Sequence, residues 1–130
     1  MKYIFGIIIS LVVLAGFLLV WNGNLIKEGS NMSNDVVDMV RSDEDIILID
    51  VRTPQEYRER RIPGSILLPD YEIRDRAADV IPDKDARIVV YCRSGRRSAQ
   101  SAHVLRDMGY ENVYDLGGIN SWPHETISGD

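Results

Sequence analysis

The sequence predicts a three-layer α/β domain, in which a parallel sheet is flanked by helices on both faces. Two short, unbroken apolar runs, at residues 46–49 and 88–91, are typical of strands buried in a parallel sheet. Segments with helical patterning lie between the expected strands, and this alternation favours parallel strands joined by covering helices. Ligands of such sheets bind beyond the carboxyl ends of the strands, so we expect functional residues there.

Residues that start or break helices mark several element ends. Thr53 and Glu56 have the spacing of a capping box, and Pro54 stands at the first helical position. Pro82 breaks the helical stretch before it, and Gly109 ends the last helix. In chain order we expect a helix from about residue 34, a strand at 46–49, a helix at 54–60, a strand at 66–68, a helical stretch at 70–80, a strand at 88–91, a helix at 98–108 and a strand at 112–115.

The N-terminal segment is almost wholly apolar from residue 3 to residue 21. As a helix it would be about 28 Å long, close to the ~30 Å hydrocarbon core of a bilayer. We expect an uncleaved membrane anchor. The alternative is a cleaved signal peptide and secretion, although the run is long for that and no Ala-x-Ala site follows it. We assign residues 1–21 to this segment, 22–34 to a linker and 35–130 to the domain.

The charge before the apolar run indicates which side of the membrane the domain occupies. Lys2 and the free amine are the only positive charges that precede the run. This weak bias places the N-terminus in the cytoplasm. We therefore expect the domain outside the cytoplasm, on the periplasmic or extracellular side.

Composition excludes several classes of function. The chain of 130 residues has a formal net charge of −5, which argues against broad nucleic-acid binding. Its single cysteine excludes an internal disulfide framework and CxxC metal spacing. The two histidines, His103 and His124, have no ligand partner at metal-site spacing. We therefore expect neither a metal nor a cofactor.

The only cysteine, Cys92, ends an apolar run and precedes a polar loop and a helix. Free cysteines are usually core residues, but the residues that follow this one favour chemistry at sulfur. A cysteine reacts as its thiolate, and nearby cations and a helix N-terminus favour that form. Gly95 can adopt a positive φ, so that successive N–H groups point inward, and Ser98 could cap the helix. The residues expected to surround an anionic group over Cys92 are Arg93, Ser94, Gly95, Arg96, Arg97 and Ser98.

Positive charge gathers around this loop although the chain is acidic. No carboxylate occurs between Asp85 and Asp107, while five arginines do. A positive spot on an acidic body would attract a small anion and repel acidic macromolecules.

Four separated motifs resemble those of rhodanese (thiosulfate:cyanide sulfurtransferase-like) domains. Residues 50–57 (DVRTPQEY) look like the family's D-x-R-x-x-x-E-[FY] stretch. Residues 61–66 (RIPGSI) resemble its H-I-P-G-A segment, with Arg where many members have His and Ser for the usual Ala. Residues 89–98 (VVYCRSGRRS) resemble the active loop, and 116–118 (LGG) with Trp122 resemble the closing motif. The match runs from about residue 35 to 127 in the family's order.

The resemblance implies a single-domain rhodanese fold with Cys92 as the nucleophile. The family's cysteine accepts a sulfane sulfur from an anionic donor such as thiosulfate, holds it as a persulfide and passes it to cyanide or a thiol. The loop arginines would orient the donor, and the loop N–H groups would stabilise the persulfide. Asp50 and Arg52 are expected to act as a supporting ion pair, and Glu56 to cap its helix.

Two alternatives remain at this point. A phosphatase or arsenate reductase also folds a cysteine loop around an oxyanion, but its signature is Cys, five residues and Arg, and Ser98 occupies that last place. A non-catalytic rhodanese-like binding module is the second alternative. Inactive members often lack the cysteine, whereas this chain keeps it.

Overall fold

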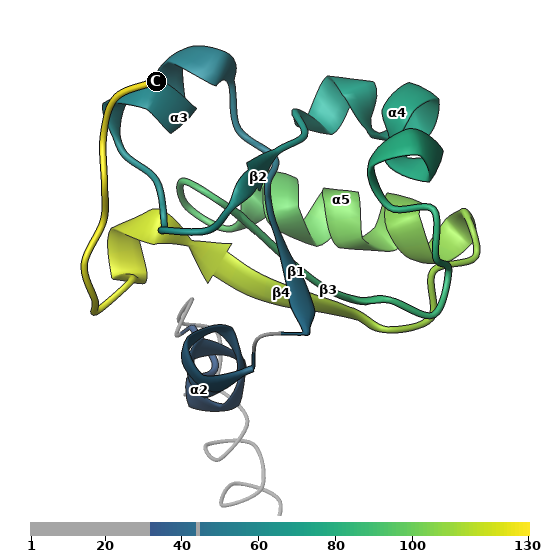
Figure 1. Ribbon diagram of the computed structural model, residues 1–130, viewed down its shortest axis with the longest axis horizontal. Coiled ribbons are helices and arrows are strands. Elements are labelled where there is room, and N and C mark those ends of the chain that lie inside the picture. The colour runs from purple at the N-terminus through teal and green to yellow at the C-terminus, as the bar shows by residue number, and fades with distance from the viewer. Residues whose placement is uncertain (1–31, 44) are drawn as a thin grey trace, which may run out of the picture. The chain divides into compact units, whose positions relative to one another are not determined.

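The sheet consists of parallel strands in the order β2-β1-β3-β4 (Figure 1). The computed structural model describes residues 32–43 and 45–130. The helices and strands of this part of the chain are α2 (Asn34–Ser42), β1 (Ile46–Asp50), α3 (Pro54–Glu59), β2 (Ile66–Leu67), η1 (Asp70–Glu72), α4 (Ile73–Val80), β3 (Arg87–Cys92), α5 (Arg96–Asp107), β4 (Val113–Gly118) and η2 (Ile119–Ser121).

Helices cover both faces of the sheet, as the sequence predicts. Figure 1 shows α4 and α5 on one side and α2 on the other. Along β3 the side chains alternate between two buried clusters: Val90 and Cys92 belong to the cluster under α4 and α5, and Val89 and Tyr91 to the one under α2. This alternation follows from the two-residue period of a strand. It directs the Cys92 side chain toward the α5 face.

Three predicted elements differ from the structure by more than a one-residue shift of an end. Helix α5 begins at Arg96 and not at Ser98, because Gly95 is its N-cap in a left-handed conformation with φ of +103°. Strand β4 continues through Gly118 instead of ending at Asp115, and a register shift opposite it lies between Val90 and Tyr91 of β3. The helical stretch predicted at 70–80 divides into η1 and α4.

The expected membrane segment at residues 1–21 lies outside the described residues, as does most of the expected linker at 22–34. Within residues 32–43 and 45–130, no helix combines the length and the apolar character that crossing a bilayer requires.

A buried ion pair forms where β1 ends. Arg52 donates from Nη2 to Asp50 Oδ2 at 2.6 Å and from Nε to Asp50 Oδ1 at 3.0 Å, and these side chains are 2% and 0% exposed. The hydroxyl of Tyr91 donates to Asp50 Oδ2 at 2.7 Å and accepts from the N–H of Ile62 at 3.1 Å. Arg52 Nη2 also donates to the carbonyl of Arg60 at 2.5 Å. The expected ion pair is therefore present, and its contacts link the ends of β1, α3 and β3.

Removing Arg52 should destabilise the fold far more than removing an arginine from an exposed ion pair. We expect Arg52→Met to lower the free energy of unfolding by about 3–5 kcal/mol, because it leaves the Asp50 charge buried without its partner. Arg76→Met breaks the exposed pair with Glu72 and should cost less than about 1 kcal/mol. Urea unfolding of both variants measures the two losses, and equal losses would contradict the structural role of Arg52.

Candidate active site

The Cys92 thiol lies at the carboxyl end of β3, where parallel sheets place their ligands. Its side chain is 1% exposed. The backbone N–H of Gly95 donates to Cys92 Sγ at 3.0 Å, and the Sγ lies 3.5 Å from the hydroxyl oxygen of Ser98. The first contact comes from the loop that follows the strand, and the second from the first turn of α5. A backbone donor aimed at sulfur stabilises negative charge that develops there during a reaction.

Gly95 makes this contact possible because its φ of +103° lies in the left-handed region. As the N-cap of α5, it turns the chain so that the helix begins directly after the loop. The first N–H groups of a helix have no partner inside the helix and form a site for anions. The loop therefore brings the thiol and unpaired backbone donors together.

Ser98 holds the base of the loop rather than capping the helix. It lies in the first turn of α5 and is fully buried. Its hydroxyl donates to the carbonyl of Gly95 at 3.0 Å and lies 3.4 Å from the carbonyl oxygen of Gly117. The expectation that Ser98 caps α5 is therefore wrong, because the helix starts at Arg96 and the cap position belongs to Gly95.

The two glycines of the predicted closing motif lie against this loop. A Cβ placed on Gly118 would be 2.3 Å from the carbonyl oxygen of Arg93 and 2.7 Å from the Cα of Ser94. A Cβ on Gly95 would meet the Cα of Gly117 at 3.6 Å. Glycine at position 118 is thus required by the close approach of two backbones, and Ser94 is left exposed at the tip of the loop.

The three loop arginines have different surroundings. Arg97 forms a two-pronged pair with Glu56, from Nη1 to Oε1 at 2.7 Å and from Nη2 to Oε2 at 3.0 Å. Arg93 Nε donates to Glu56 Oε2 at 3.1 Å. Arg96 is exposed, and no ion pair to it occurs among residues 32–43 and 45–130. The Glu56 carboxylate of α3 thus pairs with two of the three arginines that we expect from the sequence to bind the donor.

Glu56 also completes the predicted capping box of α3. The N–H of Glu56 donates to Thr53 Oγ1 at 3.2 Å, and the N–H of Thr53 donates to Glu56 Oε1 at 3.3 Å. The hydrogen bonds from Arg97 are the main reason that the pKa of Glu56 falls from 4.5 to about 2. The carboxyl group is therefore ionised across the working pH range of ordinary proteins.

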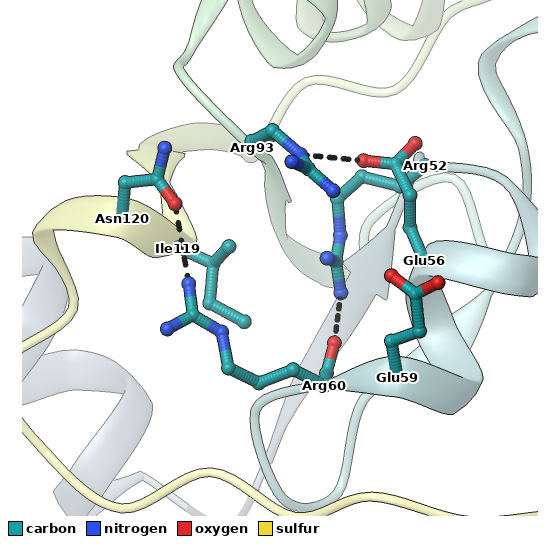
Figure 2. Close-up of a pocket in the computed structure, with 7 residues that line it drawn as sticks. All are labelled: Arg52, Glu56, Glu59, Arg60, Arg93, Ile119 and Asn120. Atoms are coloured by element: carbon teal, nitrogen blue, oxygen red, sulfur yellow. Dashed lines mark hydrogen bonds and ion pairs between the residues drawn. The ribbon is translucent and has the colours of Figure 1, made fainter.

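A cavity of about 170 Å³ lies beside the loop. Figure 2 shows it lined by charged side chains of α3, its flanking residues and the loop, together with the uncharged Ile119 and Asn120 after β4. Across it, Arg60 Nη2 donates to Asn120 Oδ1 at 3.2 Å. Its lining residues are Arg52, Glu56, Glu59, Arg60, Arg93, Ile119 and Asn120. Sequence reasoning missed Glu59, Arg60 and Asn120 as lining residues of this cavity. For Asn120, its nearness in sequence to the closing motif was an available signal, and the other two had none.

The fold agrees with the comparisons to known proteins. The family model described as the rhodanese-like domain matches residues 33–125. The chain belongs to the rhodanese-like domain family. Thiosulfate sulfurtransferase PspE of Escherichia coli strain K12 is 37% identical over 81 residues, which are 62% of this chain and 78% of that protein. A sulfurtransferase of Allochromatium vinosum is 42% identical over 80 residues, which are 61% of this chain and 73% of that protein.

Solved structures also identify the rhodanese-like fold. A structure of a rhodanese with anions from Escherichia coli has a TM-score of 0.61 and 36% sequence identity, and the match covers 64% of this chain and 98% of that one. The names of the relatives support a sulfurtransferase role at the level of the rhodanese-like family.

The Glu56 carboxylate should stabilise this rhodanese-like domain in a pH-dependent way. Because folding lowers its pKa to about 2, its stabilisation is complete above about pH 4.5 and is lost as the pH falls through about 2. Glu56→Gln keeps the capping-box geometry but removes the charge. We expect the difference in Tm between the wild type and this variant to be largest above pH 5 and to vanish near pH 2, measured by thermal unfolding. A difference that does not change with pH would contradict the role of the charge.

Proposed function

We propose that this domain is a sulfurtransferase that moves a sulfane sulfur from an anionic donor, such as thiosulfate or a persulfide, to a thiophilic acceptor through a Cys92 persulfide. The observation that carries the proposal is the N–H of Gly95 at 3.0 Å from Cys92 Sγ, in a loop that opens into the N-terminus of α5. Thiosulfate sulfurtransferases among the relatives support the reaction class.

The first half-reaction would be attack of the Cys92 thiolate on the outer sulfur of thiosulfate. A new sulfur–sulfur bond forms at Cys92 Sγ, the bond between the two thiosulfate sulfurs breaks, and its electron pair leaves on sulfite. The total charge stays at minus three on both sides, and no external oxidant or reductant is needed. The N–H of Gly95 and the free N–H groups of the first turn of α5 would stabilise the negative charge carried by the persulfide.

The second half-reaction would return Cys92 to a thiolate. Cyanide or a thiolate acceptor attacks the terminal sulfur, and the bond to Cys92 Sγ breaks with its electron pair on Sγ. Because Cys92 is the only cysteine in the chain, no second thiol of the same chain can take the sulfur. The acceptor must come from outside.

The position of Ser98 weighs against the phosphatase and arsenate reductase alternative. In that loop signature an arginine occupies the sixth position after the cysteine, where it would bind the oxyanion. Here the residue at that position is a fully buried serine, and its hydroxyl is engaged with Gly95 and Cys92. The chain therefore lacks a guanidinium at the position on which that loop signature relies for phosphate or arsenate binding.

Replacing Cys92 with serine should abolish sulfur transfer from thiosulfate and leave the fold intact, because the loop contacts are kept. Incubation of the wild type with thiosulfate, followed by intact-mass spectrometry, should show the added mass of one sulfur atom, and Cys92→Ser should show none. Thiocyanate formation in the presence of cyanide measures turnover. Retained turnover in Cys92→Ser would overturn the mechanism, and an unmodified wild-type mass after trapping would overturn thiosulfate as the donor.

We further propose that the domain works outside the cytoplasm, held by a membrane anchor at residues 3–21. The support is the apolar run with its single preceding lysine. In cells producing the full chain, the domain should sediment with membranes and be digested by protease added to the outer side of the inner membrane. Release into the soluble fraction after export would indicate a cleaved signal peptide, and complete protection from protease would contradict export.

A further inference from the structure

We propose that the arginines after Cys92 have different roles that Glu56 determines. Arg97 and Arg93 bind Glu56 and support the Cys92 loop, whereas Arg96 binds the anionic sulfur donor. Glu56 and Arg97 are then positioning residues, and Arg96 determines the preference for anionic donors. This inference rests on the proposed sulfurtransferase function, because it names the residue at which that function receives its donor.

The first step is that the acceptor sites of Glu56 are filled. Oε1 accepts from Arg97 Nη1 and from the N–H of Thr53, and Oε2 accepts from Arg97 Nη2 and Arg93 Nε. A carboxylate offers about four acceptor positions, so this one is saturated. Glu56 occupies the Nη1 and Nη2 pair of Arg97 donors and balances the charge of the guanidinium. A donor anion at Arg97 would therefore meet a guanidinium whose charge a carboxylate already balances.

The second step is that this arrangement is sheltered. The Glu56 side chain is 14% exposed and that of Arg97 is 30% exposed. Exposed ion pairs contribute little because water screens them, whereas a two-pronged pair between partly buried groups keeps its geometry. Because the pKa of Glu56 is lowered to about 2, chiefly by the hydrogen bonds from Arg97, the carboxylate stays charged at any pH at which the enzyme would work. Arg97 is thus held as part of the framework, whereas Arg93, which is 55% exposed and makes one hydrogen bond to Glu56, is held less firmly.

The third step concerns Arg96. It is the first residue of α5, directly after Gly95, whose N–H donates to Cys92 Sγ. Its side chain is exposed and has no ion-pair partner in the described part of the chain. Its positive charge is therefore balanced by no carboxylate of residues 32–43 and 45–130, and it belongs to the N-terminal residue of α5, where the unpaired backbone donors lie. A doubly charged donor gains most from such a charge.

The experiment compares KM and kcat for thiosulfate, which carries two negative charges, and for benzenethiosulfonate, which carries one. For thiosulfate, Arg96→Ala should raise KM about tenfold, the size of one lost charge-assisted hydrogen bond, with kcat changed less than about twofold. Arg97→Ala should instead lower kcat and the Tm, with KM changed less than about twofold, because the loop loses its link to α3. The KM effect of Arg96→Ala should be smaller for benzenethiosulfonate.

Glu56→Gln should change KM for thiosulfate in the opposite direction to Arg96→Ala, and Glu59→Gln is its matched control. Freed from the carboxylate, Arg97 and Arg93 become available to the donor, so KM for thiosulfate should fall about threefold while kcat also falls. Glu59→Gln removes the same charge from the same helix, but Glu59 accepts from Gln55 Nε2 and not from a loop arginine. It should change KM less than Glu56→Gln does. Arg96→Lys should recover part of the affinity lost in Arg96→Ala, since a lysine keeps the charge but not the fork.

Two results would overturn this assignment. One is a thiosulfate KM that Arg96→Ala leaves unchanged. The other is an Arg97→Ala variant whose KM rises as much as that of Arg96→Ala. If Arg97→Ala or Glu56→Gln does not fold, the comparison of Arg96→Ala with Arg96→Lys and Arg58→Ala, an exposed arginine of α3, still decides the role of Arg96. Failure of the proposed function itself is distinct, because the wild type would then transfer no sulfur from either donor.

Discussion

The buried ion pair between Asp50 and Arg52 is the contact on which the geometry of the Cys92 loop depends. Arg52 reaches from the end of β1 to the carbonyl of Arg60, directly after α3, and Asp50 accepts the hydroxyl of Tyr91, the residue before Cys92. Burial raises the pKa of Tyr91 above its ordinary value, so its hydroxyl keeps the proton that it donates. The pair thus fixes α3 and the end of β3 relative to each other. Since α3 carries Glu56, it also fixes the carboxylate that holds the loop arginines.

A second constraint acts on the loop from the β4 side. A Cβ at position 118 would lie 2.3 Å from the carbonyl oxygen of Arg93, and glycine avoids this clash. The N–H of Asn120 donates to that same carbonyl at 3.2 Å. The loop is therefore held by side-chain charge on the α3 side and by backbone contact on the β4 side. Neither contact involves the sulfur. The thiol can lie at the centre of a rigid loop because the residues that make the loop rigid are elsewhere.

Local sequence patterns predict the backbone elements that surround the site but not the long-range side-chain contacts within it. The capping box of Thr53 and Glu56 and the position of Cys92 at a strand end follow from short-range patterns, and both are confirmed. The pair of Glu56 with Arg97 joins residues 41 positions apart, and nothing in the local pattern of either segment indicates it. The predicted start of α5 at Ser98 is wrong because Gly95, in the left-handed conformation, is the N-cap and the helix begins at Arg96. Long-range pairing is settled by the assembled sheet, which local sequence patterns do not specify, whereas the positive φ of Gly95 follows from its residue type and is confirmed.

The burial of Cys92 bears on how a protein with one cysteine can serve an external acceptor. At 1% exposure the thiol itself offers almost no surface to a bulky partner. In the proposed persulfide the reacting atom is the terminal sulfur, which lies about 2 Å beyond Sγ, the length of a sulfur–sulfur bond. The sulfite that leaves and the acceptor that enters would both bond to this terminal sulfur, so neither would touch the buried Sγ. A buried thiol with no second cysteine suits this sequence of steps, because only the transferred sulfur has to reach Sγ.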